Sequence, residues 1–176
     1  MPGINGKKVV MIIANQNFRD EELQKPKDIL EGQGAKVTVA SSSLNKAKGM
    51  LGATANPDML YNQIKVQDYD AVVFVGGSGA SEYWNDPTAH TIAKECVKNG
   101  KLLGAICIAP VTLANAGVLT GKKATVWSSE AGKLKAKGVN YTGADVQEEG
   151  QIITADGPTS ASKFGNALVK ALTGRQ

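Results

Sequence analysis

Short apolar runs rich in β-branched residues alternate with helical segments along the chain, and this alternation constrains the fold more than any other feature. Strands are predicted at Lys7–Ala14, Lys36–Ser41, Asp70–Val75, Lys101–Ile106, Lys122–Trp127 and Gln151–Asp156. Helices are predicted at Asp20–Gly32, Pro87–Lys98, Ala109–Ala116, Ser129–Lys137 and Pro158–Gly174. Such alternation indicates a mostly parallel sheet with helices on both faces. We therefore expect one α/β domain over residues 1–176.

Helix ends carry the expected signals. Asp20 is the predicted N-cap of the first helix, and Asp86 that of the second. Pro26 falls inside the first helix, where a ring without an N–H is expected to kink it or to start a new one.

Composition excludes several classes of protein. The 176 residues carry a net charge of +4, with lysines spread along the chain and no aromatic residues between them, so we expect no nucleic-acid partner. Two cysteines make no disulfide framework. No apolar stretch is long enough for a membrane span, and the N-terminal apolar run is too short for a signal peptide. We expect a cytoplasmic protein with reduced thiols.

Cys107 is the first candidate for chemistry. An apolar run ends at Ile106, small residues flank the thiol, and helical spacing follows with Pro110 in the first turn. A thiol at a strand-to-helix junction lies beside a helix N-terminus, which is expected to lower its pKa. A small buried hydrophobe is the alternative for a lone cysteine, but the small-residue elbow favours a reactive thiol. Cys96 lies in mid-helix and is expected to be structural.

The other candidates are weak when taken alone. The segment "GGSG" at 76–79 can form a tight loop with free backbone N–H groups, but it lacks the dinucleotide fingerprint, the Walker lysine and the esterase elbow. His90 is the one histidine and falls inside a predicted helix, so no spacing indicates a metal site. Glu22 belongs to an acidic first turn that is ordinary for a helix.

Together, four segments resemble the DJ-1/PfpI superfamily, a class I glutamine amidotransferase-like group. These are "VVMIIANQNFRDEELQKP", "VVFVGG", "GAICIAP" and "ITADGPTSASKFGNALVKAL". The resemblance implies a flavodoxin-like three-layer sandwich with a nucleophile elbow. It implies Cys107 as the nucleophile, Glu22 as the carboxyl within hydrogen-bond reach of it, and an oxyanion site from the backbone of Gly76, Gly77 and Ile108. It also implies a homodimer or larger homo-oligomer and no cofactor.

The departures from the family pattern bear on function. Protease-like members have a histidine directly after the cysteine, where this chain has Ile108. Deglycase-like members have a nearby histidine at the end of the following strand, where this chain has the expected pocket residue Trp127. Glu82 matches an acid that some members lend across a subunit interface. An acyl-transfer mechanism needs a proton acceptor, so these departures disfavour a peptidase.

A Cys–Glu pair without histidine suits small reactive carbonyls. The expected function is a glyoxalase- or deglycase-like stress-response enzyme in which Cys107 adds to a carbonyl carbon and Glu22 moves the proton. A non-catalytic redox sensor or chaperone, whose event is oxidation of Cys107, is the alternative. A PfpI-type intracellular cysteine peptidase is a second and weaker alternative.

Overall fold

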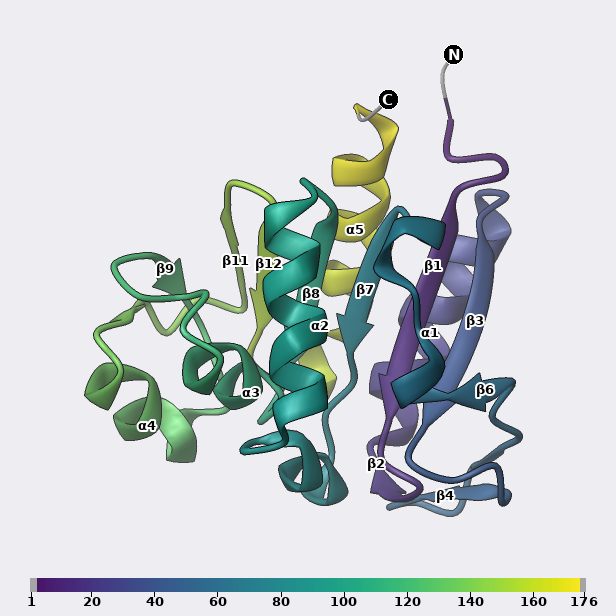
Figure 1. Ribbon diagram of the computed structural model, residues 1–176, viewed down its shortest axis with the longest axis horizontal. Helices are drawn as coiled ribbons and strands as arrows, with labels where there is room; N and C mark the ends of the chain where they lie inside the picture. The colour runs from purple at the N-terminus through teal and green to yellow at the C-terminus, as the bar shows by residue number, and fades with distance from the viewer. Residues whose placement is uncertain (1–2, 175–176) are drawn as a thin grey trace.

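A seven-stranded sheet forms the centre of the computed structural model, which describes residues 3–174 (Figure 1). In spatial order its strands are β11 (Val146–Glu149), β12 (Ile152–Ala155), β8 (Leu102–Ile106), β7 (Ala71–Phe74), β1 (Lys8–Ile13), β3 (Lys36–Ser41) and β6 (Met59–Leu60). Neighbouring strands are parallel except for β11, which runs antiparallel to β12 at one edge. The predicted mostly parallel sheet is confirmed.

Helices cover both faces of this sheet, which makes three layers (Figure 1). One face carries α1 (Asp20–Gly32) and α5 (Ala161–Thr173), and the other carries α2 (Pro87–Lys98), α3 (Pro110–Asn115) and α4 (Ala131–Ala136). Side chains of β1 alternate between the two cores: Val10 and Ile12 pack with α2, whereas Met11 and Ile13 pack with α1. The central strands are therefore apolar on both faces, as a buried parallel sheet requires.

Smaller elements decorate the edges of the sandwich. β2 (Gln16–Phe18), β4 (Ala47–Gly49) and β5 (Thr54–Ala55) form one small sheet, and β9 (Lys123–Ala124) pairs with β10 (Asn140–Tyr141). Short 3-10 helices are η1 (Tyr61–Gln63), η2 (Val66–Asp68), η3 (Ser78–Tyr83), η4 (Ser128–Glu130) and η5 (Pro158–Ser160). Within residues 3–174, no helix is long and apolar enough to cross a membrane.

Three local expectations need correction. Only Lys123–Ala124 of the predicted strand Lys122–Trp127 is extended in a ladder, because Thr125 N–H donates to the Thr154 hydroxyl and Trp127 N–H to the Cys107 carbonyl. Asp20 does not cap α1. Arg19 occupies the N-cap, and the Asp20 carboxylate accepts the N–H groups of Leu51 and Ala53 in the β4–β5 turn instead.

Pro26 lies inside a single helix rather than starting a new one. Its ring cannot donate to the carbonyl of Glu22, one turn earlier, so the first turn of α1 lacks that bond. The α carbon of Pro26 faces Gly165 of α5. A Cβ added at Gly165 would lie only 3.0 Å from that α carbon. Gly165 thus allows α5 to pack closely against α1 at the proline.

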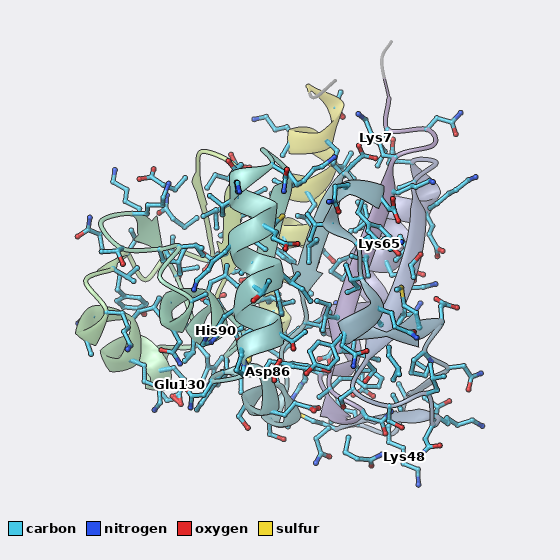
Figure 2. The ribbon with its side chains drawn as sticks, viewed as in Figure 1. Lys7, Lys48, Lys65, Asp86, His90 and Glu130 are labelled. Atoms are coloured by element: carbon cyan, nitrogen blue, oxygen red, sulfur yellow. The ribbon has the colours of Figure 1, made fainter. Side chains whose placement is uncertain are left out.

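Charged side chains are dispersed over the surface. In Figure 2, Lys7 lies near the top of the view and Lys48 at its lower end, with Lys65 between them. The ion pairs Lys27–Glu31 on α1 and Lys163–Asp145 lie at the surface. Asp86 caps α2 as predicted, with its side chain accepting the N–H of Ala89.

Candidate active site

Cys107 occupies a sharp turn at the carboxyl end of β8. Its φ is +65°, a left-handed value that costs an ordinary residue roughly 1–2 kcal/mol. Its N–H donates to the Ala155 carbonyl of β12, and its carbonyl accepts from Trp127 N–H, so both backbone groups are fixed by neighbouring segments. The predicted elbow is present, and its strained backbone is held in place by these bonds.

Glu22, in the first turn of α1, is completely buried next to this elbow. Burial raises its pKa from 4.5 to about 8, and the positive charge of Arg19 opposes the rise only in part. Neither carboxyl oxygen has a partner at full hydrogen-bond geometry among the described residues. Cys107 and the N–H of Gly76 are nevertheless close enough to lower the pKa of Glu22. The carboxyl is therefore neutral at neutral pH, with its proton available to a neighbour.

Burial also raises the pKa of the Cys107 thiol, to about 12, and an ionised Glu22 adds to the rise. Backbone N–H groups of Gly77 and Ile108 oppose it. This differs from the expectation that a helix terminus would acidify the thiol, because burial of the sulfur raises its pKa more than these two N–H groups lower it. Since Glu22 is protonated at neutral pH, its contribution to the rise is absent there, and the two groups titrate as a coupled pair.

Gly76 and Gly77 form a wall beside the acid and the thiol. A Cβ at Gly76 would overlap Glu22 Oε1 and lie 2.5 Å from Cys107 Cβ. Gly77 has φ +104°, and a Cβ there would meet the backbone at Phe18 and Arg19. The two glycines thus allow a close approach that any side chain would block. Their N–H groups face different side chains: the Gly76 N–H interacts with Glu22, whereas the N–H groups of Gly77 and Ile108 interact with the sulfur.

A cavity of about 210 Å³ opens onto Cys107, whose residue surface is 8% exposed. Its lining consists of Arg19, Met50, Gly77, Ser78, Cys107, Ile108, Trp127 and Pro158. Trp127, predicted as a pocket residue, lines it and is 45% exposed. The sequence patterns did not single out Arg19 or Met50, because each reaches the cavity from a separate loop.

His90 does not line this cavity. Its Nε2 lies 2.8 Å from the Trp84 carbonyl oxygen, which can only accept, so Nε2 carries the proton. Figure 2 places His90 near Asp86 at the start of α2. Trp84 in turn donates its indole N–H to the Ile108 carbonyl. His90 therefore supports the elbow indirectly, through a tryptophan that the sequence patterns did not single out.

The remaining candidates lie elsewhere. Cys96 is fully buried, and its thiol donates to the Leu102 carbonyl. Glu82 is exposed and does not line the cavity. Among residues 3–174, no three His, Cys, Asp or Glu side chains group in a way that would hold a metal ion.

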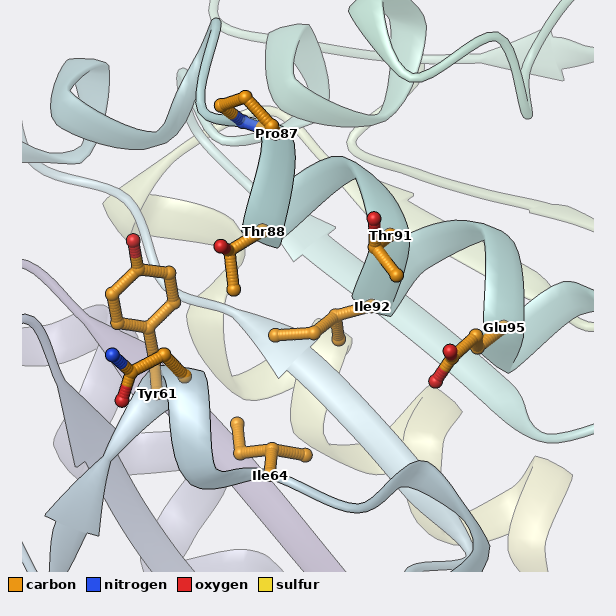
Figure 3. A pocket seen from close by; sticks show the side chains of 8 residues that line it. Tyr61, Ile64, Pro87, Thr88, Thr91, Ile92 and Glu95 are labelled. Carbon is orange, nitrogen blue, oxygen red and sulfur yellow. The ribbon is translucent and has the colours of Figure 1, made fainter.

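A second hollow, of about 280 Å³, lies between Tyr61 and Ile64 on one side and α2 on the other (Figure 3). Thr88, Thr91 and Glu95 face it from α2. Tyr61 donates its hydroxyl to Asp86, so its polar atom is already used. No cysteine lines this hollow, so we place the candidate active site at Cys107.

Comparisons with known proteins identify relatives with the same fold. The chain superposes on the crystal structure of a ThiJ/PfpI domain protein from Brachyspira murdochii with a TM-score of 0.95 and 34% identity, covering 98% of this chain and 99% of that one. It is 40% identical to an uncharacterised protein of Methanocaldococcus jannaschii over 94% of this chain and 82% of the other.

Relatives with named activities are more distant. A deglycase of Thermococcus kodakarensis is 29% identical over 93% of this chain and 98% of its own length. A glutathione-independent glyoxalase of Caenorhabditis elegans, DJR-1.2, is 28% identical over 96% and 90%. The DJ-1/PfpI family matches residues 7–171. By its sequence, its fold and the arrangement around Cys107, this chain belongs to the DJ-1/PfpI family.

Proposed function

We propose that this protein is a thiol enzyme that acts on small reactive carbonyls in the manner of a glyoxalase, converting an α-oxoaldehyde such as methylglyoxal into the α-hydroxy acid. The observation that carries the proposal is the buried, protonated carboxyl of Glu22 beside a thiol at the floor of a small cavity. The deglycase and glyoxalase relatives support the same class of substrate.

The chemistry requires only these two side chains and water. The thiol of Cys107 loses its proton to water and its sulfur adds to the aldehyde carbon, while Glu22 gives its own proton to the aldehyde oxygen, which leaves a hemithioacetal and an ionised Glu22. Glu22 then removes the proton from the former aldehyde carbon, which gives an enediol, and returns it to the ketone carbon. In the same conversion the hydroxyl of the hemithioacetal loses its proton and the ketone oxygen gains one, through water. The product is a thioester on Cys107. Water cleaves it, releasing lactate and the free thiol, so the net reaction is the addition of one water to methylglyoxal.

Backbone groups supply the charge stabilisation. The N–H groups of Gly77 and Ile108 face the sulfur and are placed to donate to the oxygen that becomes negative as the S–C bond forms. The Cys107 N–H cannot serve, because it already donates to Ala155. We therefore propose Gly77 and Ile108 for the oxyanion role, with Gly76 facing the acid.

The test is formation of lactate from methylglyoxal by the pure protein. Cys107→Ala should abolish it. Glu22→Gln keeps a donor but cannot exchange a proton, so it should lower kcat by about a hundredfold or more while Cys107 remains open to alkylation. Cys96→Ala is the matched control and should keep full activity. Lactate formation that survives Cys107→Ala would contradict the proposal.

Of the two alternative functions, the absence of an imidazole from the cavity lining favours a redox sensor over a peptidase. Among the residues that line the cavity there is no histidine, and His90 is bound to Trp84. A peptidase would need a proton donor for the leaving amine, so we expect no casein hydrolysis. A redox sensor needs no such base, because a protonated Glu22 can donate to a sulfinate on Cys107. Absence of turnover together with selective oxidation of Cys107 would favour the sensor.

A further inference from the structure

One cationic side chain, that of Arg19, belongs to the lining of the cavity over Cys107. Within the part of the chain that the structure describes, Arg19 is the only Lys or Arg in its lining, and no Asp or Glu lines it. The other lining residues, apart from Ser78 and Cys107, offer carbon surface or backbone. Arg19 is therefore the one charged residue in the lining that a ligand seated on the sulfur can meet.

Arg19 is fixed in place by two sets of bonds. Its N–H donates to the Gly76 carbonyl at 2.9 Å, which ties its backbone to the glycine wall of the site. Its Nε and Nη2 donate to the two oxygens of Glu21 at 2.9 and 3.1 Å. The side chain is only 26% exposed. A long side chain that is already ordered loses little entropy when it binds a ligand.

The bond to Glu21 leaves donors unused. A guanidinium has five N–H groups, and Glu21 occupies one edge, made of Nε and one hydrogen of Nη2. The adjacent edge, made of Nη1 and the second hydrogen of Nη2, has no hydrogen-bond partner in the structure over residues 3–174. This edge matches the two oxygens of a carboxylate.

The surrounding charges permit an anion here. Arg19 lines the same cavity as Cys107, and its charge interacts with both Glu22 and Cys107. Glu22 is neutral at neutral pH, and Glu21 is already paired. A carboxylate in the cavity would therefore meet no unpaired acid.

We propose that Arg19 makes this site selective for reactive carbonyls that carry a carboxylate, with the aldehyde on Cys107 and the carboxylate on the free edge of the Arg19 guanidinium. The proposal rests on the proposed function for the reaction itself, but not for the binding. A substrate of this class is γ,δ-dioxovalerate, an α-oxoaldehyde whose short chain ends in a carboxylate.

Alkylation of Cys107 tests the binding without any turnover. Iodoacetate and iodoacetamide react with the same thiolate, forming an S–C bond and releasing iodide, but only iodoacetate carries a carboxylate. The ratio of their rates therefore cancels the reactivity of the thiol. In the wild-type protein we expect this ratio to exceed that of free cysteine by about fivefold or more, and to fall as salt is added.

Variants then assign the effect to Arg19. Arg19→Gln should lower the ratio by about fivefold or more, whereas Lys27→Gln removes the same charge from α1 outside the cavity and should not change it. A ratio in the wild-type protein no higher than that of free cysteine would overturn the proposal, and so would an equal fall in both variants. The wild-type measurement holds even if Arg19→Gln fails to fold.

Turnover separates this proposal from the proposed function. We expect the wild-type protein to prefer γ,δ-dioxovalerate to its methyl ester by about tenfold in kcat/KM, and Arg19→Gln to remove the preference mainly through KM. Equal turnover of the acid and the ester would overturn the proposed carboxylate site but would still support the proposed enzymatic function. A raised alkylation ratio without any turnover would support the proposed carboxylate site and overturn the proposed enzymatic function.

Discussion

The backbone of the elbow is strained at Cys107, whose φ is +65°. A left-handed cysteine persists because its N–H and carbonyl are both bound by neighbouring segments. The conformation directs the thiol toward Glu22 and the cavity, while the main chain turns away toward α3. A residue with ordinary dihedral angles would continue β8 and carry its side chain elsewhere.

The cost of this conformation predicts an inverted order of stability at position 107. Alanine usually stabilises a folded chain relative to glycine, but only glycine adopts φ +65° without strain. We expect Cys107→Gly to be more stable than Cys107→Ala by about 1 kcal/mol in urea unfolding at neutral pH. Both variants lack the thiol, so the loss of sulfur contacts cancels when their free energies of unfolding are compared. A more stable alanine variant would show that the strain is absent in solution.

The two cysteines differ in access rather than in type. Cys96 is fully buried with its thiol bound to a carbonyl, whereas Cys107 borders the cavity. We expect mild peroxide to oxidise Cys107 first and to stop at sulfinate, since Glu22 can donate to it. Peptide mass mapping over a peroxide series checks the order, and Glu22→Ala should let oxidation proceed to sulfonate. Earlier oxidation of Cys96 would contradict this.

At the scale of elements, the central strands could be predicted because a strand that is buried on both faces of a sheet has a continuous run of apolar residues in the sequence. The edge strand β11 could not, since "VQEE" is polar and pairs on one side only. The segment Lys122–Trp127 has the composition of a strand, but its backbone bonds a threonine hydroxyl and the elbow. Tertiary partners therefore decided its conformation.

The site was predictable to different degrees. A run that ends in small residues marks the elbow at Cys107, whereas the acidic first turn of α1 gives no local sign that Glu22 is buried. Only the family resemblance placed Glu22 beside the thiol. Arg19 and Trp84 leave no periodic signal, because each meets the site through the fold of a loop.

Packing between elements predicts a severe effect at Gly76. A methyl group there would overlap Glu22 Oε1 and crowd Cys107 and the Ile106 carbonyl. We expect Gly76→Ala to lower the free energy of unfolding by roughly 1–3 kcal/mol and to abolish carbonyl turnover. Gly132→Ala in α4 is the control, because open space surrounds it and alanine favours a helix. Retained activity in Gly76→Ala would show that the wall is looser than described.

At the scale of the whole molecule, the two cores meet the reacting groups from opposite directions. Glu22 comes from a helix on one face of the sheet, and the turn after Cys107 leads into a helix on the other. Closing the sandwich therefore buries a carboxyl that would be ionised in the unfolded chain. The stability of the entire fold is consequently linked to the protonation of Glu22.

This linkage predicts a fall in stability between about pH 5 and about pH 8. The folded pKa of Glu22 is about 8 against an ordinary value of 4.5, so the folded state holds more protons over this range and loses stability as pH rises. The shift corresponds to an upper limit of about 5 kcal/mol. The lowered pKa values of Asp20 and Glu21 act in the opposite sense, but below this range. Urea unfolding at steps of pH measures the fall.

The neutral amide of Glu22→Gln supplies the control for this measurement. It occupies nearly the same volume and cannot ionise, so its stability should vary little with pH over the same range. The difference between the two curves then isolates Glu22 from every other titrating group. Parallel curves for the two proteins would mean that water or a small rearrangement solvates the carboxylate in solution. The proton proposed for the carbonyl chemistry would then not be held at neutral pH.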